Sequence, residues 1–151
     1  MSQSNFYAQG LCRGKTVIQL MYVSERALMT NEQDVTELVT RARLKNKRLN
    51  ITGLLACLPN YFFQILEGNR DETHGLLSVL EQDSRHFGIR VLCETSINHR
   101  DFPLWSMAHF DLDDNFCESF QMLERVAKSS PPHTANVSGV LLMLKGLSPV
   151  T

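Results

Sequence analysis

The sequence predicts an α+β domain, a ferredoxin-like β-α-β-β-α-β-β mixed sheet with two helices on one face and C-terminal cap helices on the other. The first observation is the order of short apolar runs and longer segments whose apolar residues recur at helical spacing. The second is size, because 151 residues with 43% hydrophobic and 21% charged side chains suffice for one domain with a core. The expected strands cover residues 17–23, 50–58, 61–67, 88–95 and 104–110.

The first strand and the first helix follow a short polar start. Residues 1–15 are expected to form a flexible lead-in, and residues 17–23, with the sequence VIQLMYV, are typical of a strand. Residues 31–47 are expected to be helical and to begin at a capping box of Thr30 and Gln33. The apolar positions of this helix recur at i, i+3, i+4 and i+7, at Val35, Leu38, Val39 and Ala42.

A hairpin and a second helix come next. The second and third strands are separated by Pro59-Asn60, which is a turn signal. Asn69 is suited to cap a helix over residues 70–83. Acidic residues suit the first turn of a helix, and apolar residues spaced three and four apart form its buried face. These residues are Asp71 and Glu72 in the first turn, and Leu76, Leu77 and Leu80 on the face.

The last 40 or so residues are expected to cap the free face of the sheet. A helix is predicted over residues 113–127, with Phe116, Phe120 and Leu123 on one side, and a short helix over residues 136–146. Ser-Ser-Pro-Pro-His at 129–133 separates the two. The predicted organisation is therefore a lead-in at 1–15, a folded domain at 16–110 and a helical cap at 111–151.

Composition excludes several classes of protein. The net charge of −1 argues against direct binding of nucleic acid or of an anionic membrane, and no apolar run reaches the roughly 20 residues that span a bilayer. The polar N-terminal segment does not resemble a secretory signal. Four cysteines lie far apart without a C-x-x-C pair, so they are expected to be free thiols in a reducing cytoplasm, with no metal site.

One amide stands in the middle of an otherwise apolar strand. Burying Gln64 without a partner would cost a few kcal/mol, so either another side chain or a ligand must pair with it. Strand alternation places Tyr22 with the apolar residues of one face, and Trp105 on the same face as Met107. Each of these residues alone is more often ordinary core, but together they could line one pocket.

The ordered set of motifs resembles the BLUF family, flavin-binding sensors of blue light. The resemblance runs from about residue 17 to residue 110. It rests on Tyr22 near the end of the first strand, Asn46 ahead of NITGLL at 50–55, FFQILEG at 62–68, DSRH at 83–86 and FPLWSM at 102–107. Each piece is weak alone, and their order and spacing make the set specific.

The resemblance implies a non-covalently bound flavin, usually FAD, with FMN or riboflavin as alternatives, between the two helices. It implies that the excited flavin takes an electron and then a proton from Tyr22. Recombination then leaves the Gln64 amide rearranged. The implied flavin-binding residues are Tyr22, Asn46, Gln64, Asp83 and Arg85, with Lys45 at a position that varies in relatives. The implied photoactive residues are Tyr22, Gln64, Trp105 and Met107.

The sequence thus predicts a short photoreceptor, not an enzyme, that signals to an unknown downstream protein through its C-terminal cap, as a homo-oligomer. No phosphate-binding loop, metal motif or catalytic triad is evident in the tail. Two alternatives stay open at this level. One is a flavin-dependent enzyme, and the other is a ferredoxin-like binding or small hydrolase domain without flavin.

Overall fold

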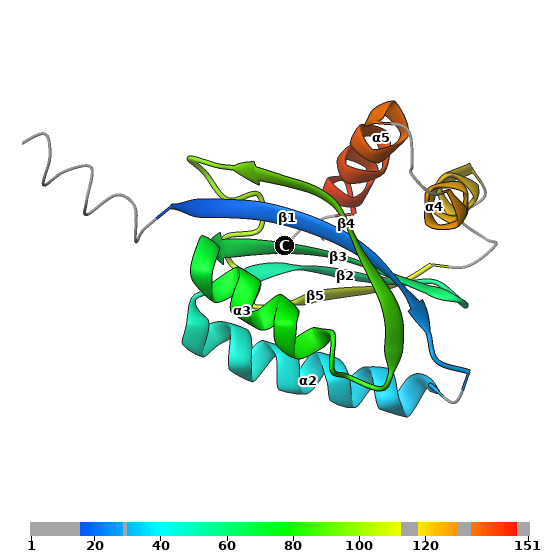
Figure 1. The fold of residues 1–151 in the computed structure, drawn as a ribbon, viewed down its shortest axis with the longest axis horizontal. Helices are drawn as coiled ribbons and strands as arrows, with labels where there is room; N and C mark the ends of the chain where they lie inside the picture. Colours follow the sequence, from blue (N-terminus) through cyan, green and yellow to red (C-terminus); the bar gives the residue numbers. More distant parts are fainter. Residues whose placement is uncertain (1–15, 29, 113–117, 130–133, 148–151) are drawn as a thin grey trace, which may run out of the picture.

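A computed structural model describes residues 16–28, 30–112, 118–129 and 134–147, arranged in three layers. A five-stranded sheet in the order β4-β1-β3-β2-β5 forms the middle layer (Figure 1). The strands are β1 (Val17–Arg26), β2 (Thr52–Cys57), β3 (Tyr61–Asn69), β4 (His86–Ser96) and β5 (Ala108–Asp111). The helices are α2 (Glu32–Leu49), α3 (Arg70–Leu80), α4 (Glu118–Lys128) and α5 (Thr134–Lys145).

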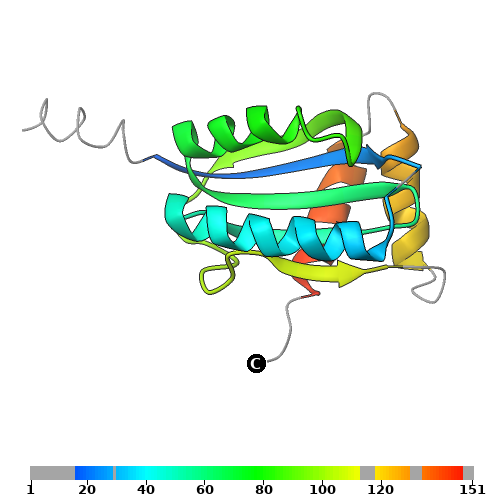
Figure 2. The same cartoon turned by 90° about the horizontal axis from the view of Figure 1, so that it is seen from below.

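The helices divide between the two faces as the sequence predicts. Helices α2 and α3 run side by side across one face, and α4 and α5 lie behind the sheet (Figures 1 and 2). The α+β, ferredoxin-like prediction with C-terminal cap helices is therefore confirmed. The expected lead-in at 1–15 and Phe116 lie outside the described residues.

The sheet is mixed, and its register brings polar residues of distant segments together. β3 is the central strand and pairs antiparallel with β1, which places Tyr22 directly opposite Gln64. β2 pairs antiparallel with β3 and parallel with β5, so Leu55 lies between Gln64 and His109. The short edge strand β5 is thus two strands away from the centre of the sheet.

Each face of the sheet has its own apolar core. Ile18, Leu20 and Tyr22 belong to the core under α2 and α3, whereas Met21 and Val23 belong to the core under α4 and α5. This alternation agrees with the sequence prediction, because successive strand residues point to opposite faces. The predicted apolar residues of the first tail helix, Phe120 and Leu123, are buried against the second core.

The start of α2 differs in detail from the prediction. The capping box consists of Asn31 and Asp34, not of Thr30 and Gln33: the Asn31 side chain accepts from the Asp34 N–H, and the Asp34 carboxyl accepts from the Asn31 N–H. The Thr30 hydroxyl instead donates to the Arg85 carbonyl at 2.9 Å. Asparagine and aspartate accept hydrogen bonds from the first N–H groups of a helix as well as threonine and glutamine do. The sequence is therefore compatible with a capping box at 30 and 33 or at 31 and 34.

Other element ends also move by a few residues. α3 is capped by Asn69 as predicted but ends at Leu80, because residues 81–83 form turns that bond back to Leu77, Val79 and Leu80. β5 begins only at Ala108, whereas the sequence predicts a strand from residue 104. The preceding residues belong to the loop that follows β4, and this difference changes where Trp105 and Met107 lie.

Candidate functional site

A cleft lies between α2 and α3, with the sheet as its floor. It encloses a cavity of about 160 Å³, below the usual range of about 300–1,000 Å³ for ligand pockets, within a wider hollow that is open to solvent. The surface exposed in the cleft is mainly apolar, although eight of its fifteen lining residues have polar side chains. These polar residues are Tyr22, Arg41, Lys45, Asn46, Gln64, Asp83, Arg85 and His86.

Tyr22 and Gln64 form a hydrogen-bonded pair on the floor of the cleft. The Tyr22 hydroxyl donates to Gln64 Oε1, and both side chains are almost fully buried, at 2% and 3% exposure. Burial, with the nearby Asp83 adding to it, raises the pKa of Tyr22 far above its ordinary value, so the hydroxyl keeps its proton at neutral pH. The direct cross-strand pairing of these two residues fixes the contact.

The other end of the Gln64 amide has a weaker partner. Its Nε2 donates to the sulfur of Met107 at 3.4 Å. A thioether is a weak acceptor, so this N–H group gives up little when it turns to another acceptor. The amide therefore has one strong and one exchangeable contact, which is the arrangement that a rotating side chain needs.

Asn46 lies in the wall of the cleft, near the end of α2. Its Nδ2 donates to the Ser106 carbonyl at 2.8 Å, and its Oδ1 is buried without a hydrogen-bond partner in the described part of the chain. A buried acceptor without a donor is costly, so this oxygen indicates a missing hydrogen-bond donor. Lys45 and Arg41 line the same wall and bring positive charge to it.

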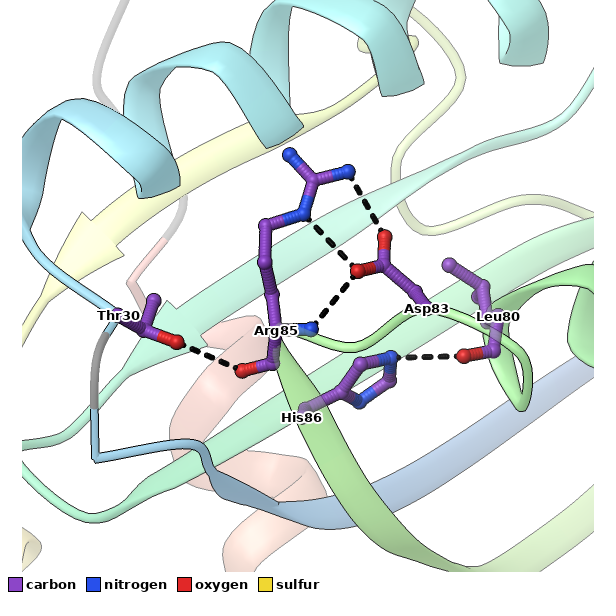
Figure 3. Close-up of polar contacts among 5 residues, drawn as sticks. All are labelled: Thr30, Leu80, Asp83, Arg85 and His86. Atoms are coloured by element: carbon purple, nitrogen blue, oxygen red, sulfur yellow. Dashed lines mark hydrogen bonds and ion pairs between the residues drawn. The ribbon is translucent and has the colours of Figure 1, made fainter.

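Asp83, Arg85 and His86 close the cleft at the end of α3 (Figure 3). The Arg85 guanidinium forms a bidentate pair with Asp83, at 2.9 and 2.8 Å. Burial works to raise the pKa of Asp83, but the hydrogen bonds and the charge of Arg85 outweigh it and hold that pKa below its usual value. The carboxyl is therefore ionised and locked at neutral pH.

His86 is a neutral, buried neighbour of Tyr22. Burial lowers the pKa of its imidazole. Nε2 lies 2.9 Å from the Leu80 carbonyl (Figure 3), and Nδ1 lies 2.8 Å from the Ser24 hydroxyl. Nε2 therefore carries the proton and donates to Leu80, and Nδ1 accepts from Ser24. The ring centroid lies 6.3 Å from that of Tyr22, so His86 packs against the Tyr22 ring.

Trp105 does not join this group. It stacks on Phe102, with centroids 5.9 Å apart, and packs against the core under α4 and α5, whereas Met107 belongs to the core under α2 and α3. The prediction that Trp105 and Met107 share a face is therefore wrong in this structure. Strand alternation fails because residues 104–107 are loop, in which side chains do not alternate.

Two residues of the cleft were missed by sequence analysis. Arg41 lies four positions before Lys45 on α2, so the i, i+4 spacing from Lys45 was the signal for it. His86 belongs to the DSRH motif at 83–86, but only Asp83 and Arg85 of that motif were assigned to the flavin. Residues 83–86 form an edge of the cleft because α3 ends at Leu80 and residues 81–83 turn the chain back toward that helix.

The cleft fits a flat, largely apolar ring with polar edges. Such a group could receive a hydrogen bond from Gln64 and supply the donor that Asn46 Oδ1 lacks. A flavin ring carries both N–H donors and carbonyl acceptors on a planar apolar body, so the residues present fit it. The cationic Arg41 and Lys45 are suited to phosphate groups attached to such a ring.

Comparison with known proteins gives consistent matches. The family described as "BLUF: Sensors of blue-light using FAD" matches residues 17–108. Photoactivated adenylate cyclase subunit beta of Euglena longa is 28% identical over 117 residues, which cover 76% of this chain and 14% of that protein. The blue light- and temperature-regulated antirepressor BluF of Escherichia coli K12 is 33% identical over 79 residues, which cover 52% of this chain and 19% of that protein.

The fold has a solved counterpart. A structure described as "BlsA photo-activated state" superposes with a TM-score of 0.75 at 30% identity, over 89% of this chain and 98% of that one. The chain spans only 14% and 19% of the lengths of these two curated relatives.

Proposed function

This chain belongs to the BLUF family, whose members are described as sensors of blue light using FAD, and we propose that it binds FAD in the α2–α3 cleft and senses blue light there. The observation that carries the proposal is the buried pair of Tyr22 and Gln64 on the cleft floor, with the second end of the amide bonded, among the described residues, only to a sulfur. FMN or riboflavin would suit the ring-binding residues equally. The charged Arg41 and Lys45 favour a flavin that carries phosphate.

The mechanism follows from what these side chains can do. Bound flavin supplies absorption of blue light and a transient electron acceptor. Tyr22 is a phenol with its proton directed at Gln64 Oε1, so it can lose an electron and then pass its proton along that hydrogen bond. When both return, the Gln64 amide can settle with its donor and acceptor ends exchanged, because each end has a partner of different strength.

Four residues are proposed to hold the ring. Asn46 offers its unpartnered Oδ1 to a ring N–H, and Gln64 offers its Nε2 to a ring acceptor. Arg85, fixed by Asp83, places a cation at one end of the cleft. Lys45 lines the wall of the cleft and is proposed to face the phosphate groups of the flavin rather than its ring.

The output is proposed to pass through Met107. Rearrangement of the Gln64 amide changes its contact with the Met107 sulfur, and Met107 leads directly into β5. Trp105 lies in the same loop and packs toward the helices α4 and α5, which makes it a second element of the route. The receiver is proposed to be another protein, with a homo-oligomer of this chain as the signalling unit.

The relatives support this output only by analogy. One is named as a cyclase subunit and one as an antirepressor, so related sensors are found in an enzyme and in a regulator of repression. We assign this chain the role of sensor rather than enzyme. A cytoplasmic location is part of the proposal, and the free thiols of Cys57 and Cys93 agree with it. No described helix has the length and apolarity that crossing a membrane would require.

The test is absorption spectroscopy before and after blue light, on the parent and on Tyr22→Phe. The parent is expected to purify yellow and to show a reversible red shift without added substrate. Tyr22→Phe keeps the ring and should still bind flavin, but it should show no red shift, because the proton and the readily lost electron are gone. Tyr61→Phe is the matched control, since Tyr61 packs against the opposite core.

Three outcomes would contradict the proposal. A colourless parent protein would favour a flavin-free binding domain. A yellow protein that is inert to light but turns over a substrate would favour a flavin-dependent enzyme. A normal red shift in Tyr22→Phe would exclude Tyr22 as the electron donor.

A further inference from the structure

Three metal-binding side chains meet at the edge of the sheet, away from the α2–α3 cleft. Cys57 lies at the end of β2, and His109 and Asp111 lie on β5. The sulfur, imidazole nitrogen and carboxylate oxygen all lie within 4.8 Å of one another, and His109 Nε2 is 3.1 Å from Asp111 Oδ1. The parallel pairing of β2 and β5 creates this group, because it places Cys57 opposite Asp111 and Leu55 opposite His109.

The donor set is that of a transition-metal site. Zn²⁺ is bound by cysteine sulfur, histidine nitrogen and aspartate oxygen, with three protein ligands and an open fourth position in many sites. Bond lengths of about 2.0–2.3 Å place tetrahedral donor atoms roughly 3.3–3.6 Å apart, so small side-chain rotations would bring the group to that geometry. A thiol and an imidazole disfavour Mg²⁺ and Ca²⁺, which prefer oxygen ligands.

The surroundings allow an ion to enter. A second cleft is open at this edge, and Glu32 lines it together with the three donors. Cys57 is buried, His109 is half-buried and Asp111 is exposed, so the site runs from the core to solvent. Water can complete the coordination.

Arg26 lines the same cleft, and its positive charge opposes a cation. Its guanidinium is engaged elsewhere, however. It donates to the Leu58 carbonyl at 2.9 Å and to the Thr30 carbonyl at 3.4 Å, and it lies 5.0 Å from the centre of the Phe62 ring. These contacts hold the cation of Arg26 on neighbouring carbonyl groups and on an aromatic face, which reduces its conflict with a bound metal ion.

We propose that Cys57, His109 and Asp111 form a Zn²⁺ site that joins β2 to the edge strand β5. On binding, the sulfur–zinc bond replaces the S–H bond of Cys57 and the thiol proton leaves to solvent. No redox partner is needed. The site depends on the pairing of β2 with β5 and not on flavin, so it stands independently of the photoreceptor function.

A metal ion at this site should stabilise the β5 edge of the sheet. β5 has four residues and pairs only with β2 among the described strands. A metal that bridges β2 and β5 should therefore slow local opening of that edge. Met107, the sulfur partner of Gln64, immediately precedes β5, so the bridge also restrains the segment that contacts the cleft.

The experiment is titration of the flavin-loaded full chain with ZnCl₂ against a chromophoric chelator, followed by Co²⁺ substitution. The background carries Cys12→Ser and Cys117→Ser, because these two thiols lie outside the described residues and could bind metal themselves. One equivalent of Zn²⁺ is expected to bind. Co²⁺ should show the visible d–d bands of a tetrahedral thiolate site at wavelengths beyond the flavin absorption.

Variants locate the site. Asp111→Asn and His109→Gln change partly exposed side chains and should fold. Each should weaken Zn²⁺ binding by more than the roughly 10–100-fold that is typical when a residue hydrogen-bonded to a metal ligand is changed. Cys57→Ser should do the same and remove the thiolate band of Co²⁺. Cys93→Ser is the matched control, because Cys93 is a half-buried thiol on β4, and it should bind like the parent.

Hydrogen exchange tests the bridge itself. Zn²⁺ should slow amide exchange in Ala108–Asp111 of the parent and leave Asp111→Asn unchanged. The proposal is overturned if the background protein binds no Zn²⁺, if the three ligand variants bind as tightly as the parent, or if exchange in β5 does not change when Zn²⁺ is bound.

Discussion

Gln64 and Glu67 are buried polar residues three positions apart on β3, and they lie on opposite faces of the sheet. Gln64 belongs to the face under α2 and α3, where it contacts Tyr22 and Met107. Glu67 is fully buried on the other face and accepts from the backbone N–H groups of Asp101 and Phe102, at 2.9 and 2.7 Å. Both residues pair with a polar residue directly opposite on β1.

The difference lies in the kind of partner. Glu67 is bound by backbone N–H groups and by Gln19 Nε2 at 3.0 Å, and all its partners donate to a group that can only accept when ionised. Gln64 is bound by side chains that can turn, and it has both a donor and an acceptor end. Strand β3 thus carries an anchor, Glu67, on one face and a switch, Gln64, on the other. Backbone partners fix the position of the Glu67 carboxylate, whereas side-chain partners allow the Gln64 amide to exchange its hydrogen bonds.

The largest expected effect is on the switch. Gln64→Leu keeps the bulk and removes the amide, so the light-induced red shift should vanish completely. The free energy of unfolding should fall by no more than about 1–2 kcal/mol. The Tyr22 hydroxyl loses its acceptor, but it borders the cleft and can form a hydrogen bond with a group inside the cleft. Light-minus-dark absorption and urea titration measure the two quantities, and a parent-like red shift in the variant would rule out the amide switch.

Substitutions of Glu67, the anchor, should lower the unfolding free energy and leave the red shift unchanged. Glu67→Ala leaves the buried Phe102 N–H and the partly buried Asp101 N–H without an acceptor. At about 1–3 kcal/mol for the buried group and less for the other, the unfolding free energy should fall by roughly 1–4 kcal/mol. Glu67→Gln keeps one acceptor oxygen and should cost less. Protein that remains folded should keep its red shift, since no contact with Tyr22 or Gln64 is altered. A red shift lost in folded Glu67→Gln would show that the two faces do not act separately.

Sequence analysis found the switch but not the anchor. Gln64 stands out because it interrupts an apolar run, and Tyr22 follows from strand alternation. Glu67 ends the same run and looks like an ordinary charged strand end, because its partners are backbone groups of a loop more than 30 residues away. Backbone donors leave no mark in the sequence, so a pattern of side chains cannot reveal them.

The fold was predictable for a related reason. The order of elements and the two apolar faces follow from periodicity, which is local, and both were confirmed. The misplacement of Trp105 arose where periodicity ends, in the loop before β5. The group formed by Cys57, His109 and Asp111 was missed because strand pairing, not spacing, brings its members together.

A smaller effect is expected in the wall of the cleft. Asn46→Ala removes the unpartnered Oδ1 and the bond to Ser106, so flavin should bind about 1–3 kcal/mol more weakly, while the red shift of bound flavin persists. Flavin fluorescence titration measures the affinity. Asn98→Ala, in an exposed loop position, is the control. Equal flavin affinity in Asn46→Ala and the parent would show that Asn46 does not hold the ring.

The smallest effect concerns the link from the anchor to α5. Asp101, whose N–H donates to Glu67, forms an ion pair with Lys145 at 2.9 Å. Burial works to raise the pKa of Asp101, but the hydrogen bonds from Lys145 and Gln19 outweigh it and hold that pKa below its usual value. The stability that this pair contributes is therefore present above the ordinary carboxyl pKa of about 3.9 and is lost as the pH falls through the lower folded-state pKa.

Lys145→Gln should reduce that dependence on pH. In this variant the folded-state pKa of Asp101 should move back toward the ordinary value. The unfolding free energy should therefore fall less steeply below about pH 4 than in the parent. At pH 7 the loss should stay within about 1 kcal/mol, because the Asp101 side chain is 42% exposed and solvent screens the pair. Urea titrations between neutral and acid pH measure the slope. Lys128→Gln is the matched control, since Lys128 pairs with Glu124 within α4 at 3.6 Å, away from the anchor. If both lysine variants keep the acid slope of the parent, the ion pair contributes nothing to the anchor, and α5 is held to the sheet by its apolar face alone.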